Sequence, residues 1–171
     1  SQGDQTLVYY DMKTGEIHRV GSIEDNPHQC RVLVSDEFGN VYGSTWDRVI
    51  YRYDPKHKQM SCLLTRIPHD PKAPQPKRDP KSLYWRSTHW GMMLWDPVTK
   101  WHYGILCNDE YLFRFRPPKP GSHRAEVEGL AQIGFRPSEV QPRFASLGLT
   151  RKGRTIYYCS YPIWRSMAHL T

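Results

Sequence analysis

Short runs rich in Val, Ile, Tyr, Trp and Phe recur along this chain of 171 residues, and each run is closed by Gly, Asn or an Asp-Pro pair. Such runs, bounded by turn residues, are typical of β-strands joined by tight turns. Amphipathic helical periodicity is almost absent from the same sequence. The sequence therefore predicts an all-β fold.

The clearest structural unit lies in residues 31–65. We expect strands at 31–35, 41–44, 49–53 and near 60–65, because Asp-Glu-Phe-Gly-Asn and Asp-Pro-Lys-His-Lys provide turns between them. Four consecutive strands joined in this way form an antiparallel meander.

The same order of strand, turn, strand, polar loop and strand occurs again in residues 92–115, and a further copy opens at residue 145. A repeated meander cannot bury both faces alone, so its copies must stack. One partial copy precedes them. We expect a half unit at 7–20, full units at 28–67 and 82–133, a half unit at 143–171, and a proline-rich basic surface loop at 66–81.

Several of these runs resemble the sheet motifs of bacterial β-propellers, in the broad group that includes gluconolactonase-like proteins and propeller-type polysaccharide lyases. They are Gly39-Asn40-Val41-Tyr42-Gly43, Val49-Ile50-Tyr51-Arg52-Tyr53-Asp54-Pro55, Tyr111-Leu112-Phe113-Arg114-Phe115 and Gly153-Arg154-Thr155-Ile156-Tyr157-Tyr158. The resemblance implies four-stranded propeller blades. Two full units and two halves are fewer than the four to eight blades of a closed propeller. We therefore expect the chain to be a fragment, or a second chain or second copy to complete the ring.

In propellers of this kind, ligands usually bind where the innermost strands begin, beside the loops between second and third strands. We call this face the rim. The resemblance implies that the rim collects residues that are scattered in the sequence. They are His28, Trp46, Asp47, Arg48, Arg86, His89, Trp90, Asn108, Asp109, Arg143, Tyr161 and Trp164.

The stretch Tyr84-Trp85-Arg86-Ser87-Thr88-His89-Trp90 combines guanidinium, imidazole, hydroxyl and aromatic groups. Aromatic faces stack on sugar rings, and Arg pairs with carboxylate or sulfate groups. In a β-elimination lyase a cation neutralises the uronate, and a base removes the acidified proton. We therefore expect a polysaccharide lyase in which Arg86 or Arg143 neutralises charge and His28 or His89, aided by Tyr161, transfers the proton.

Six rim residues are predicted to bind the saccharide: Trp46, Arg48, Trp90, Asn108, Tyr161 and Trp164. Three alternatives stay open. A propeller could bind a glycan or protein without catalysis, or hydrolyse a lactone with Asp47, Asn108 and Asp109 around a divalent ion. The Trp and Tyr residues could also simply fill space between sheets, as they often do in propellers.

The formal charge of +7 favours anionic partners. We expect an acidic polysaccharide or oligosaccharide and no nucleic acid, since the sequence has no helix for a major groove and no RNA-binding signature. No apolar run is long enough to cross a membrane. The location is undetermined, with a secreted or periplasmic one favoured.

The eight histidines show no His-x-x-x-His spacing, so no metal is assigned, although His28 and His89 could meet at a central channel. The identity of any cofactor is left unknown. Cys30, Cys62, Cys107 and Cys159 lack the spacing of a metal knuckle. We expect buried free thiols in preference to disulfides, because each cysteine lies in or beside an apolar strand pattern.

Overall fold

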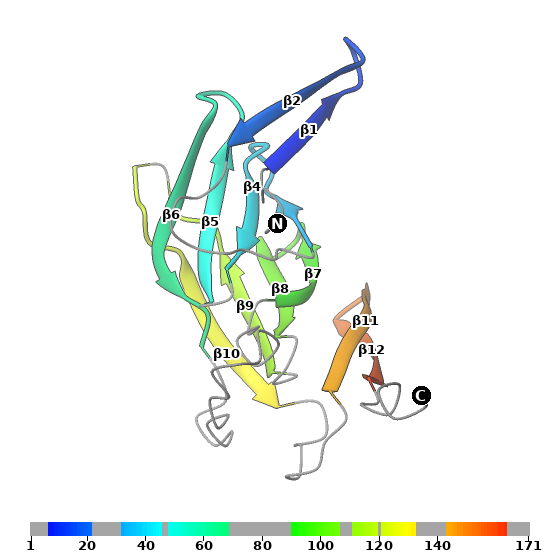
Figure 1. Cartoon of the computed structure of the whole chain (residues 1–171). Helices are drawn as coiled ribbons and strands as arrows, with labels where there is room; N and C mark the ends of the chain where they lie inside the picture. Colours follow the sequence, from blue (N-terminus) through cyan, green and yellow to red (C-terminus); the bar gives the residue numbers. More distant parts are fainter. Residues whose placement is uncertain are drawn as a thin grey trace, which may run out of the picture.

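The computed structural model describes residues 7–21, 32–45, 48–68, 90–106, 111–119, 121–132 and 143–163, with side chains in the last range given for 152–158 only. These residues contain twelve strands and no helix (Figure 1). The all-β prediction is confirmed. None of the described residues belongs to a helix that could cross a membrane.

Two four-stranded antiparallel sheets form the centre of the described structure, and each has its strands in sequence order. Sheet I contains β3 (Val34–Ser35), β4 (Val41–Ser44), β5 (Val49–Asp54) and β6 (Gln59–Arg66). Sheet II contains β7 (Trp90–Asp96), β8 (Trp101–Leu106), β9 (Tyr111–Arg116) and β10 (Glu126–Gln132). Both sheets are therefore the meanders that the sequence predicts.

Two hairpins flank these sheets. The N-hairpin pairs β1 (Leu7–Asp11) with β2 (Glu16–Gly21), and the C-hairpin pairs β11 (Arg143–Lys152) with β12 (Thr155–Ile163). The described strands do not form a closed ring.

The hairpin turns share a local mechanism. Gly15 N donates to Asp11 O at 2.8 Å, and Lys100 N donates to Asp96 O at 2.8 Å. The last residue of each loop, Gly15, Lys58 or Lys100, has a positive φ between 51° and 75°. A left-handed residue at this point reverses the chain while keeping the strands in register.

Sheets I and II pack face to face through aromatic side chains. Tyr42 of β4 lies edge-on to Phe115 of β9, with ring centroids 5.7 Å apart, and within sheet II Trp90 of β7 stacks on Phe113 and Phe115. All four side chains are buried. Burial of such large rings is the main stabilising contribution to an interface of this kind.

Hydrogen bonds also cross between the two sheets. Trp90 Nε1 donates to the Val32 carbonyl at 2.8 Å, and His102 Nε2 donates to the Ser35 carbonyl at 3.2 Å. On the other side, Leu64 N of β6 donates to the His123 carbonyl, just before β10, at 2.8 Å. These bonds fix the relative position of the sheets, because each satisfies a polar group at a mostly apolar interface.

The sheets follow one another as layers. The ring centroids of Tyr9 in the N-hairpin and Tyr53 in β5 lie 6.4 Å apart, on the face of sheet I opposite to Tyr42. At the other end of the chain, β11 packs against β7 of sheet II. The order of layers is therefore N-hairpin, sheet I, sheet II and C-hairpin. We call the face of a sheet toward the preceding layer its front face and the other its back face.

Three details differ from the sequence-based expectations. The first strand of sheet I is only Val34–Ser35, shorter than the predicted 31–35. Arg66 ends β6 and Ile67 is fully buried, so these two residues are not part of a surface loop, while 69–81 lies outside the described residues. Cys62 is free but exposed, because it lies on β6 at the edge of sheet I.

Candidate functional site

The two ends of the sheets differ in their connections. In a meander the turns from first to second and from third to fourth strand lie at one end, and the turn from second to third strand lies at the other. We call the end that carries the first-to-second and third-to-fourth turns the turn end. It includes residues 36–40, 55–58 and 97–100. The tips of β1–β2, β5–β6 and β11–β12 point the same way in Figure 1. The opposite end, with the β4–β5 turn and the starts of β7 and β11, corresponds to the predicted rim, and we call it the rim end.

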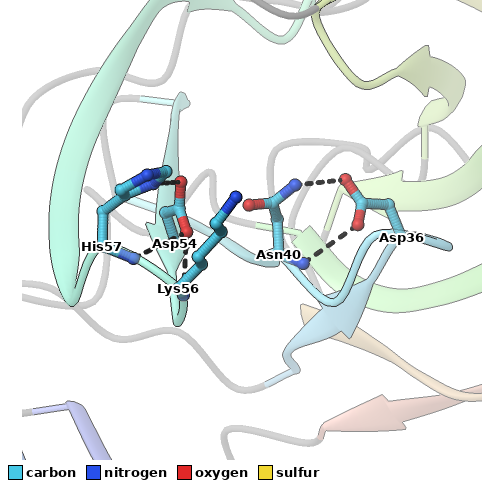
Figure 2. Close-up of polar contacts among 5 residues, drawn as sticks. All are labelled: Asp36, Asn40, Asp54, Lys56 and His57. Carbon is cyan, nitrogen blue, oxygen red and sulfur yellow. Dashed lines mark hydrogen bonds and ion pairs between the residues drawn. The ribbon is translucent and has the colours of Figure 1, made fainter.

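Carboxylates at the turn end are used to build the turns (Figure 2). Asp36 Oδ1 accepts from the backbone N–H groups of Phe38 and Asn40, both at 2.9 Å, and its Oδ2 accepts from Asn40 Nδ2 and the Tyr42 hydroxyl. Such bonds stabilise a turn by satisfying amides that the strands leave unpaired.

Asp54 performs the same task in the next turn (Figure 2). Its Oδ1 accepts from Lys56 N at 2.9 Å, and its Oδ2 bonds the His57 ring at 2.7 Å, which lowers the pKa of the Asp54 carboxyl. Among the described residues, no three His, Cys, Asp or Glu side chains gather closely enough to hold a metal ion.

The β4–β5 turn is the best-defined feature of the rim end. Thr45 N donates to Val49 O at 2.9 Å, Arg48 N donates to Thr45 O at 3.0 Å, and Val49 N donates to Thr45 Oγ1 at 3.1 Å. Arg48 has a φ of 66°, in the left-handed region that non-glycine residues rarely adopt. The turn thus holds a half-buried arginine in one backbone conformation.

Both ends of the long connection between sheets I and II are attached to this turn. Ile67 N donates to the Arg48 carbonyl at 2.9 Å, and Trp90 N donates to Ser44 Oγ at 3.0 Å. Residues 66–90 contain six Lys or Arg and two Asp. A basic connection therefore leaves sheet I at Arg48 and enters sheet II at Ser44, on the two sides of the same turn.

The charge of the described residues also differs between the ends. Arg48, Arg66 and Arg143 lie at the rim end, where no carboxylate occurs among the residues that the structure describes. At the turn end, Asp and Lys residues occur together, and Lys100 pairs with Glu37. The loops of the rim end also contain Asp47, Asp109 and Glu110, which lie outside the described residues.

Trp90, which the sequence assigns to saccharide binding, lies in the core. It is 0% exposed, stacks on Phe113 and Phe115, and uses its indole N–H for the Val32 carbonyl. Its ring therefore joins the two sheets and offers no open face to a sugar. The alternative reading, that aromatic residues here fill space between sheets, describes this residue.

The other predicted site residues are placed only in part. Arg143 begins β11 opposite Ile163, and Tyr161 pairs with Ala145 in the C-hairpin, where the side chains are not described. The remainder lie outside the described residues: His28, Trp46, Asp47, Arg86, His89, Asn108, Asp109 and Trp164. The assignments of these residues stay predictions.

The structure also singles out His102, which the sequence did not assign to the site. It is fully buried on the front face of sheet II, with its ring stacked on Phe115 and 4.5 Å from that of Trp95. Burial lowers its pKa to about 4, and its Nδ1 has no hydrogen-bond partner in the described structure. His102 is therefore neutral near pH 7 and contributes to the core. The alternation of β8 could have indicated this, since residue 102 shares a face with Gly104.

Comparison with known proteins adds no assignment. No protein-family model matches the sequence, and no curated protein shows significant similarity to it.

Proposed function

We propose that the chain is a segment of a β-propeller that binds an acidic saccharide at its rim end. The saccharide part of the proposal is supported by Arg48, Arg66 and Arg143, which lie at strand ends on that side, and by the basic connection 67–89, which is attached to the β4–β5 turn.

The way in which the layers pack supports a propeller. First strands contact first strands, since β3 meets β7 and β7 meets β11. The third strands β1 and β5 meet through Tyr9 and Tyr53, where β1 counts as the third strand of the first, partial unit. The fourth strands β6 and β10 also contact each other. Successive blades of a propeller pack in this equivalent manner around a central axis. In this proposal the ring is completed by further residues of a longer chain, by another chain or by a second copy.

The chemistry of an arginine-rich end favours carboxylate or sulfate groups. A guanidinium forms two parallel hydrogen bonds with such a group, and each charged bond is worth roughly 1.5 to 3 kcal/mol. Arg48 suits this role because its backbone is already held by the bonds of the β4–β5 turn, which reduces the entropy lost on binding. The proposed site also includes Arg86, Arg143, His28 and His89. If the protein is an enzyme, one of the two histidines removes the proton in a β-elimination.

Titration with an oligogalacturonate, and with a neutral oligosaccharide of equal length, tests the proposal. We expect only the uronate to bind, with an affinity that weakens as salt rises. Arg48→Ala should weaken binding about 10- to 100-fold, whereas Lys56→Ala at the turn end should change it less than about twofold. Arg86→Ala should likewise matter more than Lys77→Ala.

Equal binding of both oligosaccharides, or an equal loss in the Arg48 and Lys56 variants, would contradict the proposal. Ultraviolet absorbance of an unsaturated product separates lyase from binding module. A His28 or His89 variant that keeps its affinity but loses product formation would support proton abstraction.

A further inference from the structure

The N-hairpin has one covered and one uncovered face. Tyr9 and His18 stack on each other at 4.7 Å on the face toward sheet I, and both are half-buried. On the other face Val8, Tyr10 and Ile17 are 47%, 60% and 72% exposed, and Tyr10 pairs directly with Ile17. Three large apolar side chains exposed on one side of a two-stranded sheet mark an interaction surface, because their burial against a partner is favourable.

A second incompletely covered surface is the back face of sheet II. The guanidinium carbons of Arg114 and Arg116 each lie 4.4 Å from the ring centre of Trp101, and the two arginines pair with Glu128 and Glu126 of β10. Arg114 remains 30% exposed and Arg116 42% exposed. Beyond this face the C-hairpin supplies only two strands, β11 against β7 and β12 next to it.

The contact between sheets I and II shows how such a surface is covered. On the back face of sheet I, Tyr42 lies opposite Arg52, and Phe115 of the next front face contacts the Tyr42 ring. Tyr103 and Arg114 form the equivalent pair on the back face of sheet II. In β1, Val8 and Tyr10 hold the strand positions that Tyr51 and Tyr53 hold in β5 and that Phe113 and Phe115 hold in β9.

We propose that the N-hairpin of a second copy of this chain covers the back face of sheet II, with its β1 beside β12. This inference rests on the propeller arrangement proposed above. The chain's own N-hairpin cannot do so while it packs on the front of sheet I, because both sheets lie between. The new sheet would have the order β11, β12, β1, β2, which repeats the four-stranded order of sheets I and II.

Two such contacts, related by a twofold axis, close a ring of six sheets from two chains. Six lies within the range of four to eight blades that closed propellers use. The arrangement also pairs the outer edges of β1 and β12, which would otherwise be open to unspecific strand pairing.

The mass of the intact chain in solution, measured by light scattering across micromolar concentrations, tests the inference. We expect a dimer. Tyr10→Glu should raise the dimer dissociation constant about 30- to 100-fold, because it places a charge in the centre of the contact. Met12→Glu is the matched control: Met12 is 89% exposed in the β1–β2 turn, outside the contact, and its replacement should change the constant less than about threefold.

Ile17→Glu provides a second variant with the same expected effect, should Tyr10→Glu fail to fold. A monomeric wild-type chain, open polymers, or a dimer that tolerates the Tyr10 and Ile17 changes as well as the Met12 change would each overturn the inference. A monomer that binds oligogalacturonate would overturn this contact and leave the saccharide site standing. A dimer that does not bind the uronate would overturn the saccharide site and leave this contact standing.

Discussion

The back faces of sheets I and II carry equivalent residues in different surroundings. On sheet I, Tyr42 is 1% exposed and donates its hydroxyl to Asp36, while the buried Nε of the neighbouring Arg52 has no hydrogen-bond partner in the described structure. On sheet II, Tyr103 is half-exposed, and Arg114 pairs with Glu128. The next layer encloses Tyr42 on the first face, whereas Tyr103 and Arg114 on the second remain partly open to solvent.

This difference shows that coverage by the following sheet decides what the same strand pattern does. Burial, together with the Asp36 carboxylate, raises the pKa of Tyr42, so the covered tyrosine keeps its proton and donates it to Asp36. On the open face, hydrogen bonds from Arg114 to Glu128 and Tyr103 raise the pKa of the guanidinium. A covered face stabilises the fold through packing. The solvent-exposed ion pairs of an open face contribute little to the free energy of unfolding.

The largest effect is expected from removing the side chain that covers the back face of sheet I. Phe115→Ala should lower the free energy of unfolding by about 3 to 5 kcal/mol, because it deletes a fully buried ring that contacts Tyr42, Trp90 and His102. Urea denaturation measures this change. Leu64→Ala, at a position 69% exposed, should change it by less than about 0.5 kcal/mol. Similar losses in both variants would show that the interface is not tightly packed.

Acid should weaken the same interface through His102. Burial holds the pKa of this histidine at about 4 in the folded protein, against an ordinary value of 6.5, although the Ser35 carbonyl and Asp36 oppose the shift. The unfolded chain therefore takes up a proton first as the pH falls. The neutral His102 makes its full contribution to the free energy of unfolding above pH 6.5. This free energy should decline by about 3 kcal/mol as the pH falls to 4.

Denaturation at several pH values would detect this decline. His102→Phe should remove that component of the pH dependence, whereas His123→Phe, at an exposed position, should retain it. An unchanged pH dependence in His102→Phe would contradict the assignment.

The smallest effect compares the two equivalent tyrosines directly. Tyr42→Phe removes a buried hydroxyl bonded to Asp36 at 2.8 Å and should lower the free energy of unfolding by about 1 kcal/mol. Tyr103→Phe, on the open face, should lower it by only about 0.3 kcal/mol, since water replaces the lost bond. The difference between the two variants in one denaturation series is the test, and a larger loss for Tyr103 would reverse the comparison.

Much of the fold could be predicted from turn residues and alternation. The Asp-Pro turns at 54–58 and 96–100 separate strands at the expected places, and the Tyr-Gly pairs at 42–43 and 103–104 lie in the second strand of each sheet. Each glycine has a reason: a side chain at Gly43 would collide with the Tyr51 ring, and one at Gly104 with the Phe113 ring. The strand β10 was not located, because Glu-Val-Glu-Gly-Leu-Ala-Gln at an exposed sheet edge contains few β-branched or aromatic residues.

The candidate site was less predictable. Arg48 lies in the loop where the repeat places it, since a turn between second and third strands is a local property. Trp90 could not be assigned in the same way, because a tryptophan at the start of a strand can face a ligand or a neighbouring sheet. Its complete burial and the bond from its indole N–H to the Val32 carbonyl place it against the neighbouring sheet, and Val32 lies 58 residues away in the sequence.

The sequence by itself determined the all-β class, the meander order and the turns, because strand alternation and turn chemistry act between residues close in the chain. The tertiary structure alone decided which face of each strand is covered. Tyr42 and Tyr103 follow the same local pattern, yet only Tyr42 is enclosed, since burial depends on the next layer and not on the strand itself. The same reason makes His102 and Trp90 core residues and leaves Val8, Tyr10 and Ile17 exposed.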